Sequence, residues 1–156
     1  MSSILKVSEI QDPTGKKILQ NTGGMLQVKQ ATNETSTSTS STSYVSTGLS
    51  VDITPTSTSS KILLTFVGAA VRKTTDSAIY FALYKDGSVV NAIIEGLFDT
   101  GDSQNITDYV PSVYLDSPAT TNQITYEIYW KCASGTIYLN VGNWGITTLT
   151  AQEISA

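Results

Sequence analysis

Apolar and polar residues alternate with a period of two along most of this chain, from Met25 to Ile154. In the segment 124–131 the apolar side chains share one face and the charged ones the other: Ile124, Tyr126, Ile128 and Trp130 against Glu127 and Lys131. No segment repeats its apolar residues at helical spacing. The pattern therefore predicts β-strands, each with one buried face and one face in water.

Turn residues divide the alternating pattern into short segments. The most apolar of these, 61–71, is rich in β-branched residues and too short to cross a membrane, so it predicts a buried central strand. Asp86-Gly87 predicts a hairpin turn, and Pro111 predicts an edge strand or a bulge. The tract 32–43 is almost entirely Ser and Thr and predicts a long polar loop, while 92–98 carries no decisive pattern. Strands are predicted at 25–30, 43–45, 49–53, 61–71, 79–84, 89–90, 109–115, 124–131, 136–141 and 146–154.

Many short strands with turns between them predict an all-β fold, an antiparallel β-sandwich of jelly-roll type, over residues 25–156. Residues 1–24 differ in character. Segment 4–10 alternates, Asp12-Pro13-Thr14-Gly15 is a turn signal, and 16–19 is a short return run. A hairpin this short cannot bury its own apolar side chains. The sequence therefore predicts that residues 1–24 are an attachment or oligomerisation segment.

Composition narrows the possible functions. The 156 residues suffice for one domain, and only 14% are charged where soluble domains have about 25%. Ser, Thr, Asn and Gln must therefore keep the surface polar. The net charge is -4 with no basic cluster, which argues against nucleic-acid binding. No apolar stretch approaches the roughly 20 residues of a membrane-spanning helix, and the N-terminus lacks a secretory signal pattern, so we expect no membrane insertion.

Catalytic and metal-binding chemistry finds little support. Cys132 is the one cysteine and the chain has no histidine, so we expect a buried structural thiol and no cofactor. Asp99, Asp102 and Asp108 could supply a carboxylate pair for glycan cleavage, and the loop 99–105 could supply oxygen ligands to calcium. They lack the flanking context of either site. We expect a solvated polar loop, no enzyme activity and no metal.

Aromatic residues near turns are candidates for receptor binding. Rings stack on the apolar faces of sugars while neighbouring polar groups read their hydroxyls. Trp144, between Asn143 and Gly145, is the best candidate, with Tyr109 and Tyr114 behind it. The alternative for Trp144 is a plug at the end of the sandwich. Trp130 lies on the apolar face of its predicted strand, and we expect it in the core.

A string of short motifs in order gives the chain a family resemblance: residues 5–15, 23–28, 47–55 with 57–64, 84–87, 124–126, 134–140 and 151–154. Together they resemble the C-terminal jelly-roll domain of tail-fibre and virion structural proteins of marine and cyanobacterial tailed phages. The resemblance implies a head like those of the tumour necrosis factor and complement families, assembled as a homotrimer, with the N-terminal segment toward other virion proteins.

That resemblance implies a virion location, and it leaves two functions open. The first is a tail-fibre or knob module that recognises a host-surface glycan or protein. The second is a capsid decoration or adaptor that binds only other virion proteins. The small residues Gly68 to Ala70, which leave room for a close neighbour, are a further motive for predicting a trimer.

Overall fold

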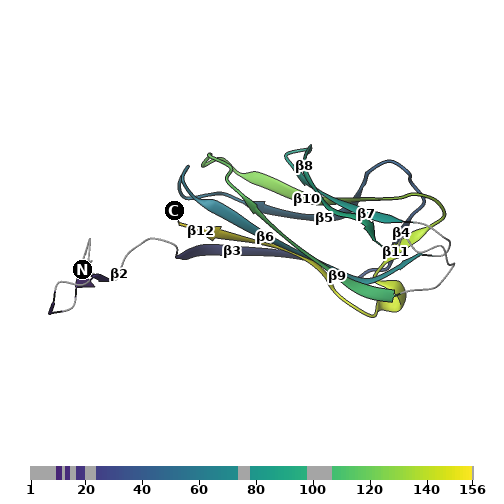
Figure 1. Ribbon diagram of the computed structural model, residues 1–156, viewed down its shortest axis with the longest axis horizontal. Helices are drawn as coiled ribbons and strands as arrows, with labels where there is room; N and C mark the ends of the chain where they lie inside the picture. The colour runs from purple at the N-terminus through teal and green to yellow at the C-terminus, as the bar shows by residue number, and fades with distance from the viewer. Residues whose placement is uncertain are drawn as a thin grey trace, which may run out of the picture.

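The computed structural model describes residues 10–11, 13–14, 17–19, 24–73, 78–97 and 107–155. Within this part the strands from residue 25 onward form two antiparallel sheets packed face to face, and the two short strands before them form a separate two-stranded sheet (Figure 1). The strands are β1 (Ile10–Gln11), β2 (Lys17–Leu19), β3 (Met25–Asn33), β4 (Thr37–Thr39), β5 (Val45–Ile53), β6 (Lys61–Lys73), β7 (Ile79–Lys85), β8 (Ser88–Leu97), β9 (Thr107–Asp116), β10 (Ile124–Cys132), β11 (Ile137–Leu139) and β12 (Thr147–Ile154), with a 3-10 turn η1 (Val141–Asn143) before β12.

The order of the strands defines the fold. One sheet has the order β5-β10-β7-β8. The other has the order β3-β12-β6-β11-β4, and β9 also pairs with β6. The eight long strands are, in chain order, β3, β5, β6, β7, β8, β9, β10 and β12. Counted in that order, the first, eighth, third and sixth form one sheet, and the second, seventh, fourth and fifth form the other. This interleaving is the jelly roll, and the predicted fold class is confirmed.

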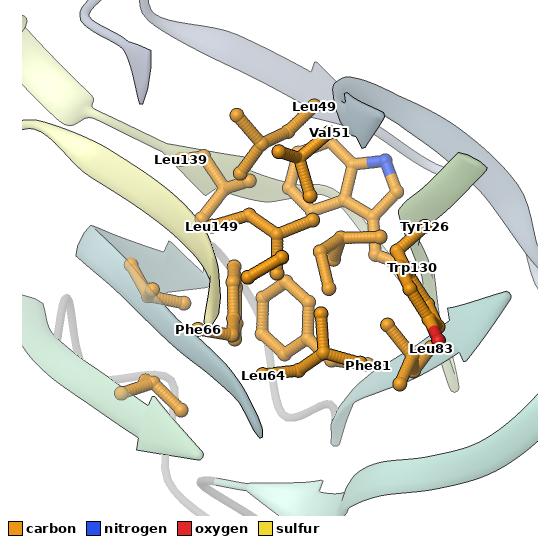
Figure 2. Packing of buried hydrophobic residues seen from close by; sticks show 14 of the residues in the cluster. Leu49, Val51, Leu64, Phe66, Phe81, Leu83, Tyr126, Trp130, Leu139 and Leu149 are labelled. Atoms are coloured by element: carbon orange, nitrogen blue, oxygen red, sulfur yellow. The ribbon is translucent and has the colours of Figure 1, made fainter. Parts of the chain in front are cut away.

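The core lies between the two sheets and is formed by the alternating positions of both (Figure 2). Phe81 is at its centre, with ring centroids 5.2 Å from Phe66 and 6.3 Å from Trp130. The predicted burial of Trp130 and Cys132 is confirmed, since both are at most 2% exposed. Desolvation raises the pKa of the Cys132 thiol, which keeps it protonated and unreactive.

Several boundaries differ from the sequence prediction. The Ser/Thr tract is not one long loop: β3 continues to Asn33, and β4 pairs with β11. The hydroxyl side chains of the Ser/Thr tract give no alternating apolar pattern. The end of β3 and the whole of β4 are therefore recognised only from their backbone pairing. The segment without a decisive pattern belongs to β8. The Asp86-Gly87 turn has the positive φ angles, 49° and 78°, that a tight hairpin requires.

The small residues Gly68 to Ala70 do not serve the purpose predicted for them. Ala69 and Ala70 are buried, and a bulge in β6 brings Ala69 against the turn before β12. A Cβ added at Gly145 would lie 2.7 Å from the Cβ of Ala69. The close neighbour is therefore a loop of the same chain, and the use of these residues as a motive for trimerisation was wrong.

The N-terminal hairpin is described in part. β1 pairs with β2 in antiparallel fashion, as predicted for this segment. Residues 4–9 of the predicted first strand lie outside the described residues, as do Asp99 and Asp102 of the polar loop. The role of residues 1–24 in attachment stays a prediction.

One buried carboxylate joins three segments at the end of the sandwich where β3 begins. Glu153 on β12 is fully buried. It accepts hydrogen bonds from the Gln27 amide at 2.6 Å and from the backbone and hydroxyl of Thr56, both at 2.7 Å. Burial by itself would raise the pKa of Glu153, but the hydrogen bonds to the ionised form outweigh this and lower it to about 2.

We expect Glu153→Gln to remove a pH-dependent part of the stability. A lowered pKa stabilises the folded state above about pH 4.5, and this stabilisation is lost as the pH falls toward 2. At pH 7 the variant should lose about 2 kcal/mol of unfolding free energy, the size of hydrogen bonds to a charged group. Urea denaturation from pH 2 to 7 measures both effects, with Glu34→Gln controlling for the loss of one negative charge. Parallel pH profiles of wild type and Glu153→Gln would contradict the assignment.

Candidate functional site

The loop that carries Trp144 interrupts what would otherwise be a continuous strand from β11 to β12. Asn140, Gly142 and Asn143 all have positive φ, at 54°, 66° and 58°. Asparagine and glycine adopt this conformation at the least cost, so the sequence here matches the backbone. The backbone amides of Asn143 and Trp144 donate to the carbonyls of Asn140 and Val141. Residues 140–146 are called the Trp144 loop below.

A buried polar network fixes this loop to the sheet. Asn140 is fully buried, and its side-chain amide donates to the carbonyls of Asn33 at 2.9 Å and Thr35 at 3.1 Å. Its carbonyl oxygen accepts from the Thr147 hydroxyl at 2.8 Å, and that hydroxyl in turn accepts from the Ala69 amide at 3.0 Å. Every polar group of the Asn140 side chain is bonded, which gives the loop one conformation.

Trp144 and Tyr109 come together on the surface at this end of the sandwich. Trp144 is 74% exposed and Tyr109 is 58% exposed. The Tyr109 hydroxyl donates to the Trp144 carbonyl at 3.3 Å. A Cβ added at Gly142 would lie 3.1 Å from the Trp144 ring, so the ring rests against the glycine backbone. With three quarters of its surface in water, Trp144 is not a plug for the sandwich.

The other two candidate residues have different positions. Asn143 is exposed beside Trp144 and lines an open depression with Glu34, Thr35, Gly145 and Ile146. Tyr114 lies on the inward face of β9 and packs against the core, where it lines a small apolar pocket with Phe66 and Leu83. The structure therefore brings Asn143, Trp144 and Tyr109 together and leaves Tyr114 apart, because residues 109 and 114 fall on opposite faces of one strand.

The outer face of the sheet β3-β12-β6-β9 has no charged side chain over three consecutive rows of four residues. Strand pairing aligns Val28-Gln152-Leu63-Leu115, then Gln30-Thr150-Thr65-Val113, then Thr32-Thr148-Val67-Pro111. Val113 is 64% exposed, Val28 49% and Leu115 48%. We call these three rows the uncharged face. Exposed apolar side chains gathered on one sheet face are typical of a protein contact.

The edges of this sheet are protected against strand addition. β9 pairs only with β6 among the described strands, and Pro111 removes an amide donor from its open edge. The prediction that Pro111 marks an edge strand is confirmed. On β3 at the opposite edge, Lys29 occupies a position in register with the inward-facing Ala151. A lysine pointing inward at a sheet edge disfavours pairing with another chain. Both features disfavour pairing of these edges with a strand of another chain.

A group of tyrosines that was not predicted from the sequence lies on the outer face of the other sheet. Tyr44, Tyr80, Tyr84 and Tyr129 lie there around Lys131. The one available signal was that Tyr129 shares its strand face with Glu127 and Lys131 rather than with the core residues. That Tyr80, Tyr84 and Tyr44 join it depends on strand pairing.

No set of three or more acidic or thiol side chains that could hold a metal ion occurs among the residues that the structure describes. Asp99 and Asp102 are not among them, and the side chain of Asp108 is not described. In the described ranges there is also no helix long and apolar enough to cross a membrane.

Comparison with known proteins yields similarity in structure alone. No model of a protein family matches the sequence, and a search of curated proteins found no match. Among solved structures, the chain is similar to a chain of the infectious bursal disease virus particle, with 16% identity and a TM-score of 0.49, over 98% of this chain and 40% of that one.

Two further solved structures come from the same virus. T=1 particles derived from it match with 16% identity and a TM-score of 0.46, over 98% of this chain and 41% of theirs. The VP2 subviral particle matches with 17% identity and a TM-score of 0.41, over 83% and 38%. The chain thus spans about two fifths of the length of the viral proteins it resembles.

Proposed function

We propose that this chain is a structural protein of a virion, without enzymatic activity or cofactor, and that it is a tail-fibre or knob module for host-surface recognition. The motif resemblance to phage tail-fibre domains and the jelly-roll fold support this proposal. The observation that carries it is the separation of two ends of the sandwich. The chain enters at one end, and the exposed Trp144 loop lies at the other.

The pairing of the last strand gives the distance between these ends. Gly24 and Ser155 bond to each other where β3 begins and β12 ends. At the other end of β12, Thr147 pairs with Asn33 beside the Trp144 loop (Figure 1). Eight strand residues at roughly 3.3 Å each separate the two ends by about 25 Å. Residues 1–24 would bind other virion proteins, and the Trp144 loop would then face outward.

We propose that the module assembles as a homotrimer through the uncharged face. Copies of this face can meet without burying an unpaired charge, which would carry a large free-energy cost. The uncharged face therefore favours another copy of the same chain as its binding partner. It carries neutral Thr and Gln between apolar residues, so that two copies of it can match each other. Pro111 and Lys29 at the edges support association by faces over strand addition.

We expect Trp144→Ala to reduce binding of the purified protein to cells on which the virus grows by about thirtyfold, the effect of losing one aromatic anchor of about 2 kcal/mol. The melting temperature should change little, because the ring is 74% exposed. Flow cytometry with labelled protein measures the binding. Met25→Ala, at a residue that is 59% exposed at the start of β3, is the matched control and should bind as wild type does.

Immunogold labelling of intact virions tests the location. Label at the tail tip together with loss of binding in Trp144→Ala agrees with the proposal. Label over the whole head with no binding to cells would instead identify a capsid decoration, the second function that the resemblance left open. Absence of label from purified virions would contradict both functions.

A further inference from the structure

The tyrosines on the outer face of β5-β10-β7-β8 form a compact group, which we call the tyrosine cluster: Tyr44, Tyr80, Tyr84 and Tyr129 around Lys131. The chain has eight tyrosines, and half of them gather at this one place. The core side of the same sheet is already filled by residues of the opposite parity, such as Ile128 and Trp130. The cluster is therefore a second aromatic layer, on the side of the sheet that faces solvent.

Strand register explains how the rings meet. Tyr80 lies opposite Lys131, Ala82 opposite Tyr129, and Tyr84 opposite Glu127. The small side chain of Ala82 leaves room for Tyr129 to lean toward Tyr84. Their ring centroids are 3.8 Å apart with the planes inclined by only 20°. The pair forms a stacked platform on the sheet.

Tyr44 and Lys131 extend this platform along β10. The Tyr44 ring meets Tyr84 edge to face, with centroids 6.5 Å apart. The Lys131 ammonium lies 4.7 Å from the centroid of Tyr44 and 4.8 Å from that of Tyr80. Contacts of this kind hold both the rings and the ammonium in place before any ligand arrives. A preordered surface loses less side-chain entropy on binding.

Hydrogen-bonding groups surround the rings. Glu127 accepts a hydrogen bond from the Ser46 hydroxyl. The charge of Glu127, with partial burial and a hydrogen bond to the same carboxylate, raises the pKa of Tyr129. A tyrosine phenol is protonated at neutral pH even without this shift, so it can donate a hydrogen bond. Asp52, further along the same face, accepts from Thr125 at 2.7 Å and from Gln123 at 2.9 Å. The surface thus offers phenol and ammonium donors next to carboxylate acceptors.

We propose that the tyrosine cluster binds an uncharged polysaccharide. The flat rings match the apolar face of a sugar, and the flanking Glu127 and Lys131 can accept from and donate to its hydroxyls. Among the described side chains around the rings, the carboxylates of Glu127 and Asp52 outnumber the ammonium of Lys131, which disfavours an acidic polysaccharide. The partly exposed rings offer area for stacking without the deep cleft that a small ligand would need.

The position of the cluster agrees with the assembly proposed above. It lies on the sheet opposite the uncharged face, so a trimer formed through that face leaves every cluster open to solvent. As a host-recognition site the cluster rests on the proposed function, but its binding of polysaccharide can be measured without it. The cluster also differs in place from the Trp144 loop, so that the two sites can be separated by substitution.

The test is an array of immobilised bacterial surface polysaccharides, probed with the purified full chain. We expect wild type to bind one or more uncharged polysaccharides, and Tyr129→Ala and Glu127→Gln each to weaken this binding at least tenfold. Tyr129→Phe keeps the stacked ring and should retain most of the binding. Met25→Ala, at a residue 59% exposed on β3 in the other sheet, lies outside both the cluster and the Trp144 loop and should bind as wild type does. Circular dichroism and the melting temperature establish that each variant is folded.

The outcomes separate the two proposals. The inference is overturned if folded wild type binds no polysaccharide or only acidic ones. It is also overturned if folded Tyr129→Ala binds as well as wild type does. If Tyr129→Ala fails to fold, the other two variants decide. The inference stands if Glu127→Gln loses polysaccharide binding while Tyr129→Phe keeps it. The inference is overturned if both variants bind as wild type does. One further result is that the chain binds polysaccharide through Tyr129 and yet is absent from virions. That result would support the inference and contradict the proposed function.

Discussion

Replacing Asn140 by alanine is expected to destabilise the protein by about 3 kcal/mol and to lower its melting temperature by about 10 °C. The substitution leaves the buried carbonyls of Asn33 and Thr35 without the donor they now have. It also removes the acceptor of the Thr147 hydroxyl. In addition, alanine must then adopt a φ of 54°, which asparagine tolerates better.

Asn143→Ala is the matched control, since Asn143 has nearly the same φ, 58°, but is exposed. It should cost about 1 kcal/mol, from the backbone alone. The difference between the two variants isolates the buried network. Thermal unfolding followed by circular dichroism measures both, and equal losses would contradict the role given to the Asn140 side chain. Because the network holds the Trp144 loop, Asn140→Ala should also weaken the cell binding that depends on Trp144.

Val113→Asp is expected to abolish self-association. Val113 is 64% exposed in the middle row of the uncharged face, on the edge strand β9 opposite Thr65. A carboxylate at this position would have to be desolvated without a partner in each contact, at a cost of several kcal/mol. Sedimentation velocity should give about 50 kDa for wild type, three times 16.7 kDa, and 16.7 kDa for the variant.

The control for this experiment is Val89→Asp. Val89 is 61% exposed on β8, in the other sheet, and the same substitution there should leave the trimer intact. A monomer of 16.7 kDa for wild type at micromolar concentration would contradict the trimer. Dissociation of both variants would show that added negative charge, and not its position on the uncharged face, disrupts the assembly.

The alternating pattern was sufficient to predict the fold class and most of the core. Trp130 and Ile128 were assigned correctly because burying every second residue requires just this periodicity. The hairpin at Asp86-Gly87 was predictable for a local reason, the positive φ angles of a tight turn. By contrast, β4 could not be predicted, because Ser and Thr residues carry no periodic apolar signal and the strand exists only through its pairing with β11.

The candidate site was predicted in part. Trp144 was selected from its neighbours Asn143 and Gly145, and Tyr109 joins it through a hydrogen bond to the Trp144 carbonyl. Tyr114 was grouped with them by sequence proximity, yet strand parity turns it toward the core. Gly68 to Ala70 were correctly seen to admit a close neighbour, but the sequence did not indicate that this neighbour is the chain's own loop.

The sequence by itself therefore determined the period of two, the polar uncharged surface and the two-layer sandwich, because these depend on the order of residues along each strand. Only the tertiary structure decided which strands became neighbours. Strand pairing placed Tyr44, Tyr80 and Tyr84 beside Tyr129, aligned the rows of the uncharged face, and brought Asn140 against β3. Such contacts join residues far apart in the chain, and register across strands leaves no mark on the periodicity of any single strand.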